Sequence, residues 1–125
     1  MFPDDLKYAN TDEWIRPGDP AVVGISYFAQ DQLGDLVFVD LPKVGRALRA
    51  GEAFGTVESV KSSNEVYAPA GGEVVEVNTA LADHPELINS DPYGEGWIMK
   101  LRLANPADLD ALLDAATYEQ TRQAH

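Results

Sequence analysis

The sequence contains no cysteine in its 125 residues. Disulfide bridges, thiolate nucleophiles and cysteine-ligated metals are therefore excluded. His84-Pro85-Glu86 is too small a donor set to bind a metal by itself, so we expect no metal site. The sequence also offers no set of nucleophile, base and orienting residue. The sequence therefore contains no recognisable catalytic motif of these types.

Basic residues are scarce, with 9 Lys and Arg against 21 Asp and Glu, for a net charge of −12. Such a surface repels phosphate backbones and anionic lipid, so we expect neither nucleic acid nor a membrane as a partner. The acidity is explained either by solubility or by steering toward basic patches on partner proteins, and composition leaves both open.

Long apolar runs and targeting features are also lacking. No apolar run approaches the length needed to span a membrane. The segment Met1-Phe2-Pro3-Asp4-Asp5-Leu6 lacks the basic and apolar regions of a signal peptide, and it is acidic where a mitochondrial presequence is rich in arginine. We therefore expect a bacterial cytoplasmic protein.

What the chain does contain is a series of short apolar segments between turn residues. The length, 45% hydrophobic residues, 8 prolines and 10 glycines suit one compact domain over residues 1–125. The pattern predicts a mainly β fold, a small sandwich or open barrel with short helices. The expected strands are residues 8–15, 21–25, 36–41, 54–57, 66–67, 72–78 and 97–103, of which 36–41 is apolar on both faces and hence expected to be buried on both.

Helix signals are fewer and more local. Ser26 is a candidate N-cap for a helix that runs to Leu33 and ends at Gly34. A short helix or a loop is expected within residues 78–89. Asn105 and Pro106 predict a C-terminal helix with residues 109, 112, 113 and 116 on one face, and residues 117–120 match the capping box of a last helix.

Lys61 lies between two of the expected strands, in a stretch of polar residues with turn chemistry, Ser62-Ser63-Asn64. This pattern predicts a hairpin that holds a lysine out in water. An exposed turn lysine is by itself an ordinary solubilising residue.

The residues around Lys61 resemble the lipoyl/biotinyl attachment module, in which one lysine at a hairpin tip is acylated by a cofactor. Gly45 and Gly72 stand at sharp turns on either side, and Glu58 lies three residues before the lysine. Biotin domains usually carry methionine on both sides of the lysine. Here the neighbours are Val60 and Ser62, so the resemblance implies lipoic acid rather than biotin.

Further segments resemble the glycine cleavage system H-protein family along nearly the whole chain. They include Thr11-Asp12-Glu13-Trp14, residues 33–42, Glu58-Ser59-Val60-Lys61-Ser62, residues 72–78 and residues 91–97. The resemblance implies a carrier rather than an enzyme, with lipoic acid in amide linkage to Lys61. We expect a monomer, because a carrier must present its hairpin to three enzymes. Glycine decarboxylase loads the arm with the aminomethyl group of glycine, aminomethyltransferase passes it to tetrahydrofolate, and dihydrolipoamide dehydrogenase reoxidises the dithiol.

The enzyme that attaches lipoic acid is a fourth implied partner, a lipoyl or octanoyl transferase or a lipoate ligase. Its basic surface would recognise Glu58 beside the tip. The resemblance also implies a cleft that shelters the loaded arm, with a wall formed by Thr11, Glu13, Gln32 and Glu65. The chain departs from the family pattern where Asp12 replaces a usual histidine, where Gln32 stands in place of a histidine found in some members, and in Ser63-Asn64-Glu65, where a common pattern ends in aspartate.

Three other interpretations remain open from the residues. The first is an H-like relay protein that supplies lipoyl groups to other complexes. The second is an acid–base enzyme that uses Glu13 and Glu65 without modification of Lys61. The third is an unmodified interaction module.

Overall fold

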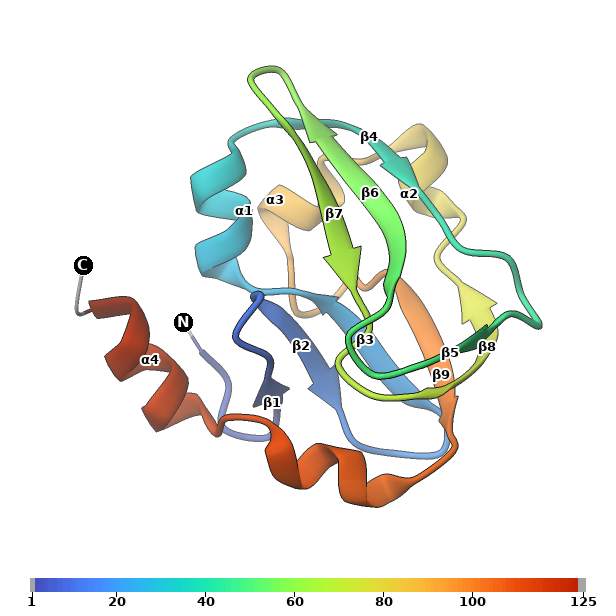
Figure 1. Ribbon diagram of the computed structural model, residues 1–125. Coiled ribbons are helices and arrows are strands. Elements are labelled where there is room, and N and C mark those ends of the chain that lie inside the picture. Colours follow the sequence, from blue (N-terminus) through green and yellow to red (C-terminus); the bar gives the residue numbers. More distant parts are fainter. Residues whose placement is uncertain (1, 124–125) are drawn as a thin grey trace.

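The computed structural model describes residues 2–123 and contains two antiparallel sheets (Figure 1). The larger sheet has six strands, in the order β1 (Lys7–Tyr8), β2 (Glu13–Arg16), β3 (Ala21–Ile25), β9 (Met99–Leu103), β8 (Gly72–Val77) and β5 (Ala47–Leu48). The smaller sheet has the order β4 (Leu36–Asp40), β6 (Ala53–Ser59) and β7 (Ser63–Tyr67). The expectation of a mainly β fold is confirmed.

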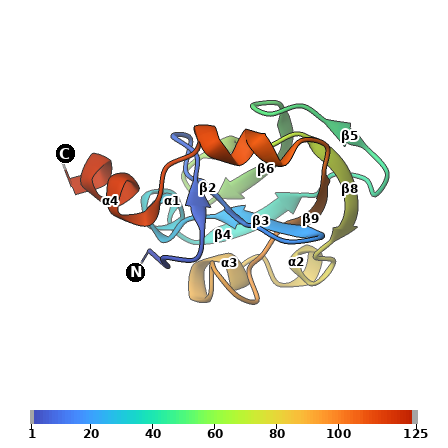
Figure 2. The ribbon, with the colours of Figure 1, turned by 90° about the horizontal axis from the view of Figure 1, so that it is seen from below.

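Short helices connect and flank the sheets. They are α1 (Tyr27–Leu33), α2 (Ala80–Asp83), α3 (Leu87–Ser90), the 3-10 helix η1 (Pro106–Ala111) and α4 (Ala115–Gln123). Figure 2 shows α2 and α3 on one side of the strands and η1 on the other. Within residues 2–123, no helix is both long and apolar enough to cross a membrane.

Two apolar clusters hold these elements together. The larger lies between the sheets and includes Val23, Phe54, Val57, Val74 and Leu101, all nearly inaccessible to solvent. Burial of each such side chain stabilises the fold by roughly 1.5–3 kcal/mol. The smaller cluster joins the first strands to α4 through Leu6, Tyr8, Trp14, Ala115 and Tyr118.

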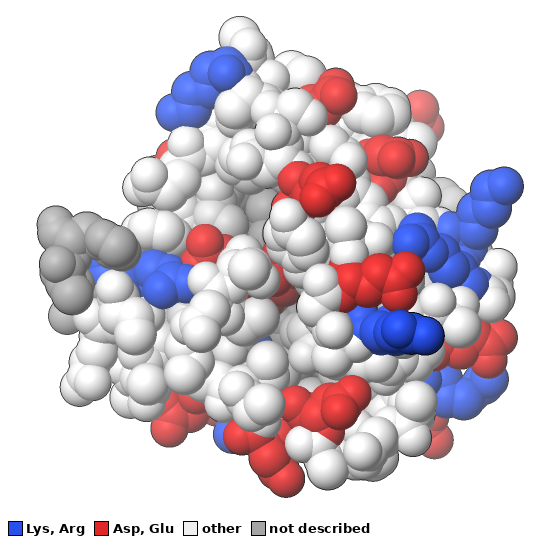
Figure 3. All heavy atoms as spheres, in the orientation of Figure 1, with Lys and Arg blue, Asp and Glu red and all other residues white. Residues whose placement is uncertain are grey.

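Acidic side chains are spread over the face shown in Figure 3, while the basic ones lie toward its edges. A hollow opens near the middle of this face. Several of the basic residues are paired with carboxylates, as in Arg46–Glu52 (3.2 Å), Lys100–Glu76 (3.3 Å) and Arg102–Glu73 (2.9 Å). These exposed pairs contribute little stability each.

The predicted strand over residues 8–15 is wrong, because a tight turn divides it into β1 and β2. The amide of Ala9 donates to the Glu13 carbonyl at 2.9 Å, and Asp12 adopts a φ of 81°. Aspartate tolerates this left-handed conformation better than most residues. The polar residues between Ala9 and Glu13 therefore form a turn. The strand expected at residues 21–25 is confirmed as β3.

The expectation that residues 36–41 are buried on both faces is also wrong. The register between β4 and β6 shifts between Leu36 and Phe38. The irregularity leaves Val37 and Phe38 both exposed, at 56% and 51%, while Leu36 and Val39 are buried. A β-bulge redirects side chains in this way and cannot be read from an apolar run. The short strand β5, within the polar segment 46–52, was not expected.

The predicted helix caps are partly confirmed. Ser26 caps α1, and Asn105 accepts a hydrogen bond from the amide of Ala107 (3.1 Å). A continuous helix with residues 109, 112, 113 and 116 on one face is wrong, because Leu113 pairs with Tyr8 through two 2.8 Å backbone hydrogen bonds. The last helix is capped by Asp114, which accepts from the amide of Thr117 (2.8 Å), so the capping box at residues 117–120 is wrong.

Candidate functional site

Lys61 lies at the tip of the β6–β7 hairpin, which projects beyond the rest of the small sheet (Figure 1). The amide of Ser59 donates to the Ser62 carbonyl at 2.8 Å, and the amide of Ser62 donates to Ser59 Oγ at 3.1 Å. Asn64 Nδ2 donates to Ser62 Oγ at 3.1 Å. These bonds close a tight loop in which Val60 is 82% exposed and Lys61 is exposed beside it.

The turn is shorter than Ser62-Ser63-Asn64 suggested. Ser63 pairs with Glu58 and Asn64 with Val57, so both residues belong to β7. Strand pairing prevails over the turn preference of serine and asparagine because the backbone groups here find partners on β6. As a result the lysine is held by strands that are paired almost to the tip.

The side chain of Lys61 passes close to the end of α1. A Cβ added to Gly34 would lie 3.6 Å from Lys61 Cε. Gly34 ends the helix, with its amide donating to the Gln30 carbonyl at 3.0 Å. None of the ion pairs formed by residues 2–123 involves Lys61. Lys61 is exposed, and the end of its aliphatic chain lies beside the α1 terminus.

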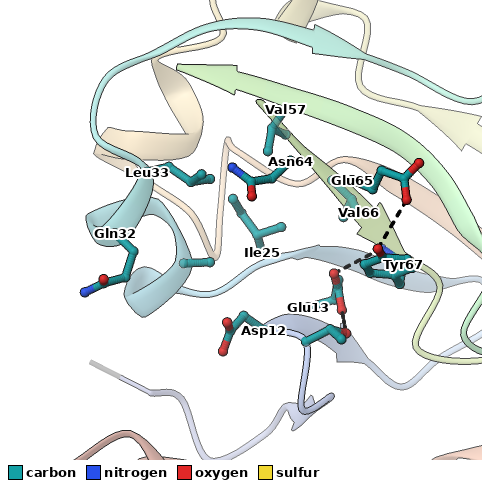
Figure 4. Close-up of a pocket in the computed structure, with 12 residues that line it drawn as sticks. Asp12, Glu13, Ile25, Gln32, Leu33, Val57, Asn64, Glu65, Val66 and Tyr67 are labelled. Carbon is teal, nitrogen blue, oxygen red and sulfur yellow. Dashed lines mark hydrogen bonds between the residues drawn. The ribbon is translucent and has the colours of Figure 1, made fainter. Parts of the chain in front are cut away.

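Beside this terminus is a cavity of about 320 Å³ (Figure 4). Five of its lining residues are apolar, Ile25, Ala29, Leu33, Val57 and Val66. The others are polar or charged: Thr11, Asp12, Glu13, Gln32, Asn64, Glu65 and Tyr67. The structure therefore brings together all four residues assigned to the cleft wall from the sequence, Thr11, Glu13, Gln32 and Glu65. Their roles stay predictions.

Glu13 is the most deeply placed acid of the cavity, only 2% exposed. One carboxylate oxygen accepts from Thr11 Oγ1, and the other accepts from the amide of Tyr67 at 3.0 Å. Burial raises the pKa of Glu13 to about 7, because the loss of hydration outweighs these hydrogen bonds. An ammonium group entering the cavity would favour the ionised carboxylate and find a partner there.

Gln32 and Glu65 lie at the rim rather than inside. Figure 4 shows the amide of Gln32 directed away from the other lining side chains. The Glu65 carboxylate accepts from the hydroxyl of Tyr67 at 3.2 Å, and this hydrogen bond raises the pKa of Tyr67. Both residues therefore line the opening, where they can contact solvent as well as a ligand.

Glu58 lies on the opposite face of the hairpin from Val57, which lines the cavity. It is half-buried and is paired with Ser63 on β7 and Phe38 on β4. Glu58 is three residues from Lys61 in the chain and is not among the residues that line the cavity. Recognition of Glu58 by a modifying enzyme stays a prediction.

Sequence reasoning missed Asn64 and Tyr67, as well as the apolar residues of the cavity. The alternation in the second hairpin strand places Val66 inward, and the same period places Asn64 on that face. The contact between the Tyr67 amide and Glu13 joins residues on different sheets. No local sequence pattern predicts that contact.

Comparison with known proteins identifies the family. Residues 6–125 match the family model described as Glycine cleavage H-protein. The chain is 64% identical over 118 residues to the glycine cleavage system H protein of Symbiobacterium thermophilum, covering 94% of this chain and 92% of that protein. It is 54% identical over 120 residues to the glycine cleavage system H protein of Thermus thermophilus, covering 95% of this chain and 94% of that protein.

A solved structure agrees with the sequence relatives. The crystal structure of a glycine cleavage system H protein from Mycobacterium marinum matches with a TM-score of 0.90 and 44% identity, covering 97% of this chain and 98% of that one. This similarity confirms the lipoyl-type fold expected from the hairpin. The chain belongs to the glycine cleavage H-protein family.

Proposed function

We propose that this chain is the lipoyl carrier of the glycine cleavage system and that Lys61 bears the lipoyl group. The observation that carries the proposal is the position of Lys61. It is exposed on a tight hairpin tip, and its side chain lies over Gly34 next to the cavity that Leu33 and Glu13 line. A carrier of this kind is not itself an enzyme, and tethering keeps its cargo at high effective concentration near each partner.

The cavity fits the chemistry of a lipoyl arm. Its apolar walls, including Ile25, Leu33, Val57 and Val66, suit a hydrocarbon chain and a sulfur ring, while its polar end holds a carboxyl group. When bound, the lipoyl group supplies the disulfide–dithiol couple that takes up the aminomethyl group of glycine. Amide formation at Lys61 removes the ammonium charge, which makes it easier for the arm to approach an apolar wall.

The residues of the cavity then have separate tasks. Glu13 accepts hydrogen bonds from the cationic amine of the cargo, and the hydroxyl of Thr11 orients the Glu13 carboxylate. Val57, Val66 and Leu33 exclude water from the cargo, which limits its hydrolysis. Gln32 and Glu65 contact the arm at the opening.

Partners follow from the family assignment. Glycine decarboxylase, aminomethyltransferase and dihydrolipoamide dehydrogenase act in turn on the oxidised, loaded and reduced carrier. A lipoyl or octanoyl transferase or a lipoate ligase modifies Lys61 and recognises Glu58. The relatives named above come from bacteria, which supports a location in the bacterial cytoplasm.

Mass spectrometry tests this proposal. Protein produced with a lipoylation system and lipoic acid should gain one lipoyl group, located on the peptide that contains Lys61. Lys61→Arg should abolish the gain, whereas Lys43→Arg, a change at another exposed lysine, should not. A lipoyl group on another lysine with Lys61 bare, or an unmodified protein that functions in glycine cleavage, would overturn the proposal.

A further inference from the structure

Asp12, in the turn between β1 and β2, is held by the C-terminal helix. Its Oδ1 accepts from Tyr118 Oη at 2.6 Å and from Arg122 Nε at 2.7 Å, and Arg122 Nη2 lies 2.6 Å from the same oxygen. Arg122 Nη2 also donates to the Asn10 carbonyl at 2.7 Å. The helix α4 thus contacts the turn between β1 and β2 at two points.

The same helix contacts α1, which forms another wall of the cavity. Tyr118 Oη lies 2.6 Å from Ser26 Oγ, and Ser26 caps α1 by accepting from the amide of Ala29 at 3.2 Å. The guanidinium of Arg122 lies 5.5 Å from the ring centroid of Phe28 in the first turn of α1. Figures 1 and 2 place α4 at the same end of the molecule as α1.

Asp12 controls the direction of two cavity residues. Its φ of 81° turns the chain between Thr11 and Glu13, and both neighbours line the cavity. Its amide donates to the Ala9 carbonyl (3.0 Å), and its carbonyl accepts from the amide of Ser26 (2.9 Å). Because the side chains of Asp12 and Arg122 are only 26% and 12% exposed, their charge-assisted hydrogen bonds are not fully weakened by solvent.

We propose that Asp12, Ser26, Tyr118 and Arg122 form a C-terminal clamp that positions the β1–β2 turn against α1 and so keeps the Glu13 carboxylate in place in the cavity. These are positioning residues. Asp12 also lines the cavity, but its role here is to hold the turn, and none of the four is assigned a contact with the cargo. The consequence for cargo protection rests on the function proposed above, whereas the clamp itself can be tested without lipoate.

The clamp is separable from the docking of α4. Tyr118 is completely buried and stacks on Tyr8, with ring centroids 4.6 Å apart. Ala115 is buried in the same cluster. These apolar contacts remain when the polar groups of the clamp are removed, so Arg122→Gln and Tyr118→Phe should leave the helix docked.

The amide of Tyr67 reports on the position of Glu13, because it donates to the Glu13 carboxylate at 3.0 Å. In the unmodified protein, Arg122→Gln should speed hydrogen exchange at the Tyr67 amide about tenfold, while amides of the buried strands β3 and β9 keep their protection. Tyr118→Phe should have a smaller effect in the same direction. Asp12→Asn combined with Arg122→Gln should be no worse than either single change, since the residues act as one unit.

Arg16→Gln is the matched control. Arg16 also lies over an aromatic ring, 5.2 Å from the centroid of Trp14, and contacts Asp5 and the Tyr93 carbonyl. It does not line the cavity. This variant should leave exchange at the Tyr67 amide unchanged. The clamp proposal would be overturned if exchange at the Tyr67 amide is unchanged in Arg122→Gln and Asp12→Asn. It would also be overturned if exchange increases equally at all amides.

A second measurement links the clamp to function. The lipoylated Arg122→Gln carrier, loaded with aminomethyl group, should release it faster than the wild type, and Arg122→Lys should restore part of the protection. If the variant and the wild type release the aminomethyl group at the same rate although exchange at the Tyr67 amide differs, the clamp only positions the turn. Its role in protecting the cargo would then be overturned. Equal release from native and denatured wild type would instead contradict the proposed cleft and leave the exchange result standing.

Discussion

Glu13 is a buried acid whose carboxylate accepts hydrogen bonds from Thr11 and from the Tyr67 amide. None of the ion pairs within residues 2–123 includes it. In this setting the neutral form is more populated than it would be in water, and a bound ammonium group should lower the raised pKa again. In the function proposed above, the same carboxyl group affects stability and binds the cargo, which gives two independent readouts.

The first readout is the dependence of stability on pH. Because the pKa of Glu13 rises from 4.5 to about 7 on folding, the folded state binds more protons than the unfolded state between these values. The free energy of unfolding should fall by about 3 kcal/mol as the pH rises through this window. Glu13→Gln should remove this contribution.

Denaturant unfolding of the unmodified wild type and of Glu13→Gln, at several pH values spanning the two pKa values of Glu13, measures the effect. The stability of the variant relative to the wild type should increase with pH. A difference that stays constant over the whole range would show that Glu13 does not titrate in this way.

Glu58 supports a second prediction at this scale. Glu58→Gln should slow lipoylation of the folded protein several-fold, because a basic enzyme surface loses a charged contact beside the tip. The matched control is Glu76→Gln, a glutamate on the other sheet that pairs with Lys100. Initial rates followed by intact mass decide the matter, and equal rates for all three proteins would remove Glu58 from recognition.

Among the elements, α1 ends at a glycine whose backbone conformation is unusual for other residues. Gly34 has a φ of 82° and a ψ of −159°, a region that glycine alone adopts readily. Gly34→Ala should lower the free energy of unfolding by about 1–3 kcal/mol. Gly18→Ala, at an exposed turn without positive φ, should cost less. Denaturant melts compare the two, and a neutral Gly34→Ala would show that the terminus relaxes freely.

Elements with local signals were predictable from the sequence. Ser26 and Gly34 bound α1 as expected, and residues 21–25 form β3 because an apolar run ends at that cap. The predictions failed where distant partners decide the conformation. Leu113 leaves the helical pattern to pair with Tyr8, and the bulge at Val37 depends on the register of β6.

The candidate site shows the same limit. Lys61, Thr11 and Glu13 followed from short segments that match the family, whereas Gln32 and Glu65 were assigned by position where the chain departs from the family pattern. The hydrogen bond that holds the Glu13 carboxylate could not be predicted, because its donor is the Tyr67 amide from the other sheet. The clamp could not be predicted from the sequence either, because it joins residues 12 and 122 at opposite ends of the chain.

For the whole molecule, the net charge of −12 predicts association that depends on salt. If the acidity steers the carrier toward basic surfaces, its association rate with dihydrolipoamide dehydrogenase should fall about tenfold between ionic strengths of about 0.01 M and about 0.3 M. Stopped-flow measurements of lipoyl reduction at limiting carrier concentration would follow this rate. A rate independent of salt would indicate that the acidity serves solubility alone.

Retention of the cargo tests the protective role of the cavity most directly. Lipoylated protein is loaded with labelled aminomethyl group, the decarboxylase is removed, and the spontaneous loss of label is followed for the wild type, Glu13→Gln and denatured protein. The wild type should lose label slowly, Glu13→Gln about tenfold faster, and denatured protein fastest. Equal rates from native and denatured carriers would show that the cavity lined by Glu13 gives the cargo no protection.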